Sequence, residues 1–386
     1  MSTLPTDLIV DILSRFSVKT LLKFRCVSKS WCTLIRSPEF VKTHLSVSAK
    51  NKDYTHHRLV WTETRNLFTS RGIKQHVLRD CSVSKLHNGS VIESLDLNYP
   101  LKNPELRVCI VGSVNGLICL DIEDNDLVLW NPTLRVYRKL PDSRLRVSGG
   151  SHLDRITSVM YGFGYDEFSD DYKVVGVRCS CTRYPLDVKI YSLKNNSWRT
   201  KGDILEVVQL TKPCKFLNGK LHWVNDMNGG FRNYGNIISI DLADERWGKV
   251  EQPDYGKKNF SLKLEMLGSD LSVFCNYKTM SRNFMTTSHA DVWVMKEYGV
   301  KESWTKTYAI KYSPNVFSDF SPFISLTLCM SNKGEILLVP GSTLTAHNPE
   351  DEPIRYPKVI NFGYCNAANI YIESLVCAPL FGTNKA

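Results

Sequence analysis

Residues 4–40 read LPTDLIVDILSRFSVKTLLKFRCVSKSWCTLIRSPEF, a stretch in which large apolar side chains recur at helical spacing. In its first part Leu8, Ile12 and Phe16 share one stripe of a helix, and Ile9 and Leu13 share the adjacent stripe. These positions predict an amphipathic helix with an unusually wide apolar face.

Two more helical patterns follow in the same stretch. Ser17 is suited to cap the second helix, and Ser28 or Ser30 to cap the third. We expect the third helix to end before Pro38, because a proline disfavours helical backbone at the preceding residue. About 40 residues cannot hide so many large apolar groups in one small core. The stretch therefore predicts three short helices with a surface for a partner.

The order of these residues resembles the F-box motif, in which Leu-Pro, Asp-Leu and Ile-Leu precede Leu-Leu-Lys-Phe-Arg-Cys-Val-Ser-Lys-Ser-Trp. The resemblance implies docking onto the Skp-type linker and cullin of an SCF ubiquitin ligase. The residues that match the motif's core or partner contact are Leu4, Pro5, Leu8, Ile9, Ile12, Leu13, Leu21, Val27 and Trp31. Sequence alone does not separate core from contact, and an ordinary helical hairpin packed on the rest of the chain is the alternative.

Composition limits the class of protein. With 386 residues, 42% of them hydrophobic, the chain can hold one large domain beside the small helical one. The net charge is +10, but the basic residues are scattered and not interleaved with aromatics, so no nucleic-acid partner is expected. Seven basic and three acidic residues in the F-box-like segment suit either encounter with an acidic linker or a solvated helix face.

Three further observations indicate the cellular compartment in which the protein acts. Twelve cysteines in so long a chain are too few for a disulfide scaffold. Met1 leads directly into the helical segment without the basic and apolar regions of a signal peptide. No apolar run approaches the roughly 18 residues of a membrane helix. We expect a protein of the cytoplasm, or of both cytoplasm and nucleus, with no membrane partner.

From about residue 50 the helical spacing gives way to short apolar runs separated by Gly, Asn and Asp, which predicts a nearly all-β structure. The strand candidates are 58–62, 108–111, 117–121, 127–130, 172–178, 188–193, 220–224, 237–241, 271–276, 291–295 and 336–339.

A weak internal repeat runs through these strands. A strand residue is followed seven positions later by an aromatic, as in Trp130 and Tyr137, Tyr191 and Trp198, and Ile240 and Trp247, with Val294 and Trp304 across a longer turn. Asn-Gly or a near variant precedes the runs that begin at 117, 220 and 335, which is typical of tight hairpins. Such units predict a β-propeller or a related circular fold with an open blade count.

The motifs GLICL, Trp130-Asn131-Pro132-Thr133, GFGYD with DYKVV, and Ser303-Trp304-Thr305-Lys306 resemble the F-box-associated domain of plant F-box proteins. Among these the chain looks most like the S-locus F-box and S-locus F-box-like group. The expected fold is a small all-α, three-helix F-box followed by an all-β, propeller-like circular domain of repeated four-stranded units. The expected boundaries are 1–48 for the F-box, 49–107 for a connecting region with the first β units, and 108–380 for the F-box-associated domain.

A search for catalytic, cofactor-binding or metal-binding residues assigns none. The chain lacks GxSxG, GxxxxGK[ST], HExxH and CxxC. Cys179 with Cys181 is a weak zinc candidate, and His56-His57 is expected in a loop or at the surface. The carboxylates Asp121, Glu123, Asp124 and Asp126 read as a solvated turn more readily than as a cation site.

An interaction surface is what remains, since long irregular loops on such scaffolds carry function. Four segments are predicted as loops: 142–156, 225–236, 277–290 and 312–325. The candidate target-binding residues in them are Arg144, Arg146, Phe231, Tyr234 and Phe284. The resemblance implies a non-catalytic adaptor that marks a target for degradation, and the S-locus resemblance implies an S-RNase as that target. A plant adaptor with an unrelated target, a binding module without ligase activity and a propeller enzyme are the alternatives.

Overall fold

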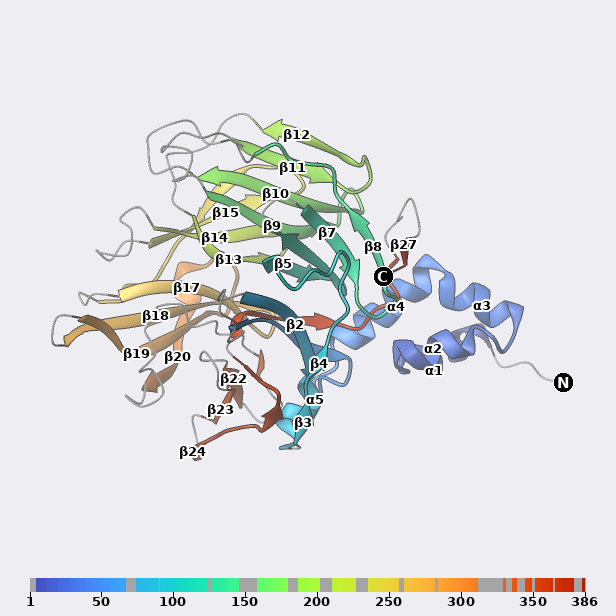
Figure 1. Ribbon diagram of the computed structural model, residues 1–386, viewed down its shortest axis with the longest axis horizontal. Helices are drawn as coiled ribbons and strands as arrows, with labels where there is room; N and C mark the ends of the chain where they lie inside the picture. Colours follow the sequence, from blue (N-terminus) through green and yellow to red (C-terminus); the bar gives the residue numbers. More distant parts are fainter. Residues whose placement is uncertain are drawn as a thin grey trace. The chain divides into compact units, whose positions relative to one another are not determined.

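The computed structural model describes residues 5–66, 74–89, 91–123, 126–145, 158–179, 187–201, 210–226, 235–256, 260–281, 284–311, 329–330, 335–338, 344–348, 351–363, 365–377 and 384–385. The chain divides into two compact units, one made of residues 1–140 with 331–386 and the other of residues 141–330. Figure 1 shows the helices and strands of both units.

The N-terminal part of the first unit is helical, with helices α1 (Thr6–Ser14), α2 (Val18–Phe24), α3 (Lys29–Arg36) and α4 (Pro38–Ala49). The predicted caps are present: the Ser17 and Ser28 hydroxyls accept hydrogen bonds from the third amide of α2 and α3. The sequence pattern does not predict the fourth helix. It forms because Ser37 adopts an extended backbone that ends α3 and caps α4, and Pro38 occupies a first-turn position that needs no N–H.

Two sheets of the first unit are formed by strands from both ends of the chain (Figure 1). The order β26-β1-β2-β4 joins Cys365–Ile372, His57–Asn66, Lys74–Ser82 and Leu95–Asp96. The order β27-β8-β7-β6-β5 joins Asn384–Lys385, Val136–Lys139, Asp126–Asn131, Leu117–Ile122 and Val108–Val114. Helix α5 (Val83–His87) and the short parallel pair β3 (Ile92–Glu93) and β25 (Val359–Ile360) complete this region. Pairing of a C-terminal strand with the first strand is the closure that a circular fold requires.

The remaining sheets are four-stranded and antiparallel. The first has β9 (Ser158–Asp166), β10 (Asp171–Cys179), β11 (Val188–Ser192) and β12 (Ser197–Lys201), and the second β13 (Leu210–Leu217), β14 (Lys220–Asp226), β15 (Gly235–Asp241) and β16 (Trp247–Val250). The third has β17 (Phe260–Leu267), β18 (Asp270–Ser281), β19 (Phe284–Met295) and β20 (Trp304–Lys311), with the short helix η2 (Lys301–Ser303) before β20. The last has β21 (Cys329–Met330), β22 (Ile336–Leu338), β23 (Thr345–Asn348) and β24 (Asp351–Arg355). The prediction of an F-box followed by an all-β domain of repeated four-stranded units is confirmed.

The seven-residue repeat has a simple structural origin. In three hairpins the two residues of the repeat are direct cross-strand partners: Trp130 with Tyr137, Tyr191 with Trp198, and Ile240 with Trp247. In the fourth the longer turn shifts the partner of Trp304 by one residue, to Met295. The repeat therefore reports a hairpin of constant length whose strand residue and aromatic lie on the same face of the sheet.

The Asn-Gly turns are tight hairpins, as predicted. Asn115 and Gly116 have φ of 54° and 82°, and Asn218 and Gly219 have φ of 49° and 72°. Two consecutive positive φ values define the turn whose twist matches that of the flanking strands. The third predicted turn, at residues 332–334, lies outside the described residues.

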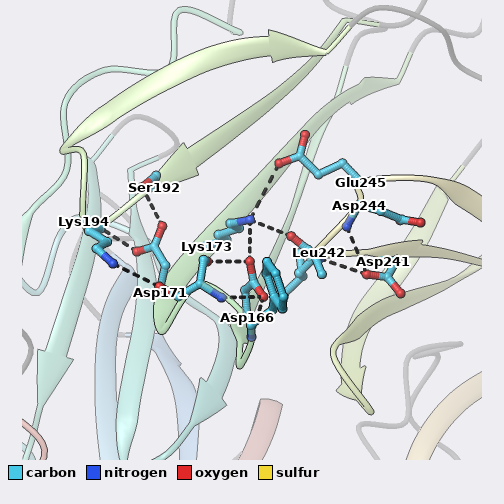
Figure 2. A network of polar contacts seen from close by, with 12 residues as sticks. Asp166, Asp171, Lys173, Ser192, Lys194, Asp241, Leu242, Asp244 and Glu245 are labelled. Carbon is cyan, nitrogen blue, oxygen red and sulfur yellow. Dashed lines mark hydrogen bonds and ion pairs between the residues drawn. The ribbon is translucent and has the colours of Figure 1, made fainter.

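The motif GFGYD with DYKVV forms the β9–β10 hairpin and ties it to the next sheet (Figure 2). Asp166 accepts hydrogen bonds from the backbone N–H groups of Phe168 and Ser169, which closes the turn. The Lys173 ammonium reaches Asp166 at 2.8 Å and the carbonyl oxygen of Leu242 at 2.6 Å. Leu242 follows β15, so one lysine links two consecutive sheets of the second unit.

The expected loop 277–290 is mostly strand. Strands β18 and β19 pair from Ser272 with Val294 to Ser281 with Phe284, with an irregularity between Tyr277 and Lys278. The polar residues that suggest a loop are Ser, Thr and Asn, and Thr in particular is tolerated in a strand. The prediction of an irregular segment here is wrong for the described residues.

The expected surface position of His56 and His57 is also wrong. Both side chains are buried, and the imidazole ring of His56 lies 5.8 Å from that of buried His44 in α4. His44 Nε2 in turn lies 2.9 Å from the carbonyl oxygen of Phe16. Burial lowers the pKa of all three imidazoles, to about 4 in the case of His57.

These histidines predict an acid-sensitive first unit. In the unfolded chain a histidine binds a proton near pH 6.5, whereas buried His44, His56 and His57 resist protonation. Their effect on the free energy of unfolding is absent above about pH 7. Below pH 6.5 the unfolded chain binds more protons than the folded chain, so each histidine lowers that free energy as the pH falls. For His57, whose folded pKa is about 4, the loss is at most about 1.4 kcal/mol per pH unit and levels off near pH 4.

Urea unfolding at pH 7.5 and pH 5.5 measures this effect. We expect a lower midpoint at pH 5.5 and a smaller difference between the two midpoints in His57→Phe. An unchanged pH difference in that variant would show that His57 does not contribute to the acid sensitivity.

Candidate linker-binding face

Helix α1 presents an apolar face to solvent. Leu8 and Ile12, one helical turn apart, are each 50% exposed, and Phe16 after the helix is 39% exposed. Val27, between α2 and α3, is 62% exposed. Large apolar side chains with this exposure in one small helical module are candidates for an interaction site. We call Leu8, Ile12, Phe16 and Val27 the exposed apolar set.

Other apolar residues of the module form its core. Leu13 of α1 and Leu21 of α2 are buried with Val18, Ile35 and Phe40. Ile9 and Trp31 are half-buried and pack against this core. Phe16, Phe24 and Trp31 form a row of edge-to-face rings with centroids 5.3 and 5.6 Å apart. The aromatic row thus connects Phe16, helix α2 and the start of α3.

The structure thus separates the predicted linker-binding residues by exposure. Leu8, Ile12, Val27 and Pro5 are exposed, Ile9 and Trp31 are half-buried, and Leu13 and Leu21 are core. Leu4 lies outside the described residues. Phe16 was not among the predicted contacts, although the i, i+4, i+8 stripe of Leu8 and Ile12 includes it.

The helices that carry the exposed apolar set also carry exposed basic side chains. Arg15, Lys19, Lys23, Lys29 and Arg36 are all exposed on the same helices or directly beside them. Arg15 forms an ion pair with Asp11 at 2.9 Å. Exposed like charges of this kind raise the rate of encounter with an acidic surface more than they raise affinity.

The predicted target-binding residues are dispersed in sequence, and the structure describes two of them. Arg144 is exposed, with a φ of 53°. Phe284 begins strand β19. Arg146, Phe231 and Tyr234 lie outside the described residues. A role for these five residues in target binding stays a prediction.

The weak metal candidates gain no support in the part of the chain that the structure describes, where no group of three or more His, Cys, Asp or Glu residues could hold a metal ion. Asp126 is paired with Lys139 at 2.7 Å, and the Glu123 carboxylate accepts the Arg107 N–H. Cys179 is the last residue of β10, and Cys181 and Asp124 lie outside the described residues. Among the described helices none is long and apolar enough to cross a membrane.

Comparison with protein families agrees with both parts of this architecture. The model of the F-box domain matches residues 1–43, and the model of the F-box associated beta propeller domain matches residues 74–347. The second match covers more than half of the chain, which therefore belongs to the family of F-box proteins with an F-box associated beta propeller domain. This combination makes the chain a substrate-recognition adaptor of an SCF ubiquitin ligase and not an enzyme.

Two curated relatives match the chain over most of their own length. F-box protein CPR1 of Arabidopsis thaliana is 30% identical over 402 residues, which cover 97% of this chain and 89% of that protein. F-box/kelch-repeat protein At3g23880 of the same plant is 29% identical over 378 residues, covering 97% and 95%. The chain is similar to both along the helical and the β parts alike.

Proposed function

We propose that the exposed apolar set docks the Skp-type linker while the β domain holds a target protein for ubiquitination and proteasomal degradation. The observation that carries this proposal is the exposure of Leu8, Ile12 and Val27 beside a separate, complete core. An interface core needs apolar side chains that are free in the unbound protein, and these three meet that requirement. The exposed basic side chains of the same helices suit an acidic linker.

The mechanism we propose is proximity. An adaptor that binds linker and target at once raises the effective concentration of target lysines beside the ubiquitin thioester. It requires no catalytic residue, cofactor or metal in this chain. The adaptor would act in the cytoplasm, the nucleus or both, where the other ligase subunits and the proteasome are found.

For the target we put forward two candidates. The resemblance of the β-domain motifs to the S-locus group supports an S-RNase taken up by pollen tubes during self-incompatibility. The net charge of +10 supports an acidic target instead, because S-RNases are basic and two basic proteins repel each other. A plant adaptor with an unrelated, acidic target is therefore the second candidate.

Affinity capture distinguishes the two. The full chain, purified with its linker, is exposed to style extract and separately to leaf extract with the proteasome blocked. Selective capture of a secreted ribonuclease from style would support the S-RNase. Capture of another protein, or of the same protein from both tissues, would remove the S-locus interpretation and leave the adaptor mechanism in place.

A further inference from the structure

The core of the helical module contains one residue from the opposite end of the chain. Leu375, 2% exposed, packs in the same cluster as Leu13, Leu21 and Ile35 of the helices. It follows strand β26, which pairs with β1 and contacts helix α4. The linker-binding helices are therefore completed by a side chain more than 300 residues away in sequence.

A fully buried asparagine holds this segment in place. The Asn131 side-chain amide donates to the carbonyl oxygens of Ser374 at 3.1 Å and Val376 at 2.8 Å. Its oxygen accepts the backbone N–H groups of Thr133 and Leu134 at 2.9 and 3.1 Å. The Asn131 side chain thus closes the turn after β7 and binds the backbone on both sides of Leu375. Asn131 belongs to the Trp-Asn-Pro-Thr motif, which acquires a physical role here.

Two hydrogen bonds and one close approach also hold the same segment. The Ser374 hydroxyl donates to the carbonyl oxygen of Asn115 at 2.9 Å. At Gly116, with a φ of +82°, an added Cβ would lie 2.2 Å from the Ser374 hydroxyl and 2.6 Å from the carbonyl oxygen of Ile372. The Glu373 N–H donates to the carbonyl oxygen of His56 at 2.8 Å. The position of Leu375 is therefore set by backbone contacts that leave it little freedom.

We infer that residues 373–376 are an integral part of the linker-binding module, with Leu375 completing its core and Asn131 serving as a positioning residue for that side chain. The inference rests on the proposed function and adds to it. Leu134 also packs against this core, so the turn that Asn131 closes supports the helices directly. The residues that complete the helical core therefore also connect the helices to strands β5 to β7.

The test uses one set of variants at Leu375 and another at Asn131, the residue that positions it. Leu375→Ala removes the buried side chain, and Leu375→Met is a volume-conserving replacement. Asn131→Asp keeps the acceptor for Thr133 and Leu134 but places a carboxylate against two carbonyl oxygens, without altering an atom of the helical core. Leu271→Ala is the matched control, because Leu271 is an equally buried leucine of β18 in the other unit.

Two readouts on the full chain test the inference. Amide hydrogen exchange should increase across α1 to α4 in Leu375→Ala and in Asn131→Asp, and return toward the original pattern in Leu375→Met. The Kd for the Skp-type linker should rise about tenfold or more in the first two variants, since only the fraction with ordered helices binds. Leu271→Ala should increase exchange in β17 and β18 and leave the linker Kd unchanged.

Unchanged exchange in α1 to α4 and unchanged linker binding in both Leu375→Ala and Asn131→Asp would overturn the inference. If these variants do not fold, native-state exchange of the unaltered chain in rising denaturant decides: the helices and the amides of Glu373 and Val376 should open together, and separate opening would overturn it. The exchange result needs no linker. A chain that fails to bind linker but shows coupled exchange would thus defeat the proposed function and not this inference.

Discussion

Replacing both Leu8 and Ile12 with aspartate is expected to raise the Kd for the Skp-type linker on the order of 1000-fold. Loss of a central apolar contact costs an interface about 2 kcal/mol or more in binding free energy. Two such losses together correspond to this change in Kd, because every 1.4 kcal/mol is tenfold in affinity. Both side chains are half exposed in the free protein and lie one turn apart on α1. A carboxylate at such a position adds the cost of removing a charge from water.

The measurement is titration of the purified linker against the full chain, followed by capture of the target with the same variant. Target binding should persist, because neither side chain belongs to the core. Phe168→Asp is the matched control, since Phe168 is 93% exposed and lies in the other unit. Equal linker affinity in the variant and in the control would contradict the assignment of this face, and joint loss of linker and target would indicate a misfolded chain.

Replacing Lys173 with methionine is expected to lower the free energy of unfolding by about 3–5 kcal/mol, the usual cost of breaking a buried ion pair by removing one partner. Lys173 is 8% exposed and contacts Asp166, which is 2% exposed. Its ammonium also lies 3.7 Å from the Glu245 carboxylate (Figure 2). Arg199 contacts the same carboxylate. Burial raises the pKa of Asp166, but hydrogen bonds from Lys173 and Ser169 lower it by more and hold it below its ordinary value. Without the lysine, that carboxylate stays buried and loses its cation.

Chemical denaturation followed by tryptophan fluorescence measures the loss. Lys194→Met is the matched control, because Lys194 is exposed and its ammonium donates to the carbonyl oxygen of Ser169, a neutral acceptor. Exposed interactions of this kind contribute about 0–1 kcal/mol. Similar losses in the two variants would contradict a special role of the buried lysine, whereas partial recovery in Lys173→Met with Asp166→Asn would identify the unpaired carboxylate as its cause.

Local pattern was enough to predict most of the helical module. The stripe of Leu8 and Ile12, the caps Ser17 and Ser28 and the break before Pro38 depend on residues within one or two turns of each other. The strands and their hairpins were equally readable, because Asn115-Gly116 and the Trp130 to Tyr137 spacing involve neighbours along the chain. Local pattern failed at 277–290, where polar residues that suit a loop continue a paired hairpin instead.

By itself, the sequence determined three short helices followed by repeated β units, because capping, periodicity and turn chemistry act over a few residues. The order of the residues in the helical stretch and in the β motifs added the resemblance to F-box proteins. Only the tertiary structure decided which apolar residues of the F-box face solvent and which are core, since neighbours such as Ile12 and Leu13 differ only in the side of the helix that other elements cover. The tertiary structure alone also placed Leu375 in the core of the helices and brought Asn131 into contact with the backbone next to Leu375. Those contacts join residues distant in sequence, and no periodicity encodes a pairing that arises when the chain closes on itself.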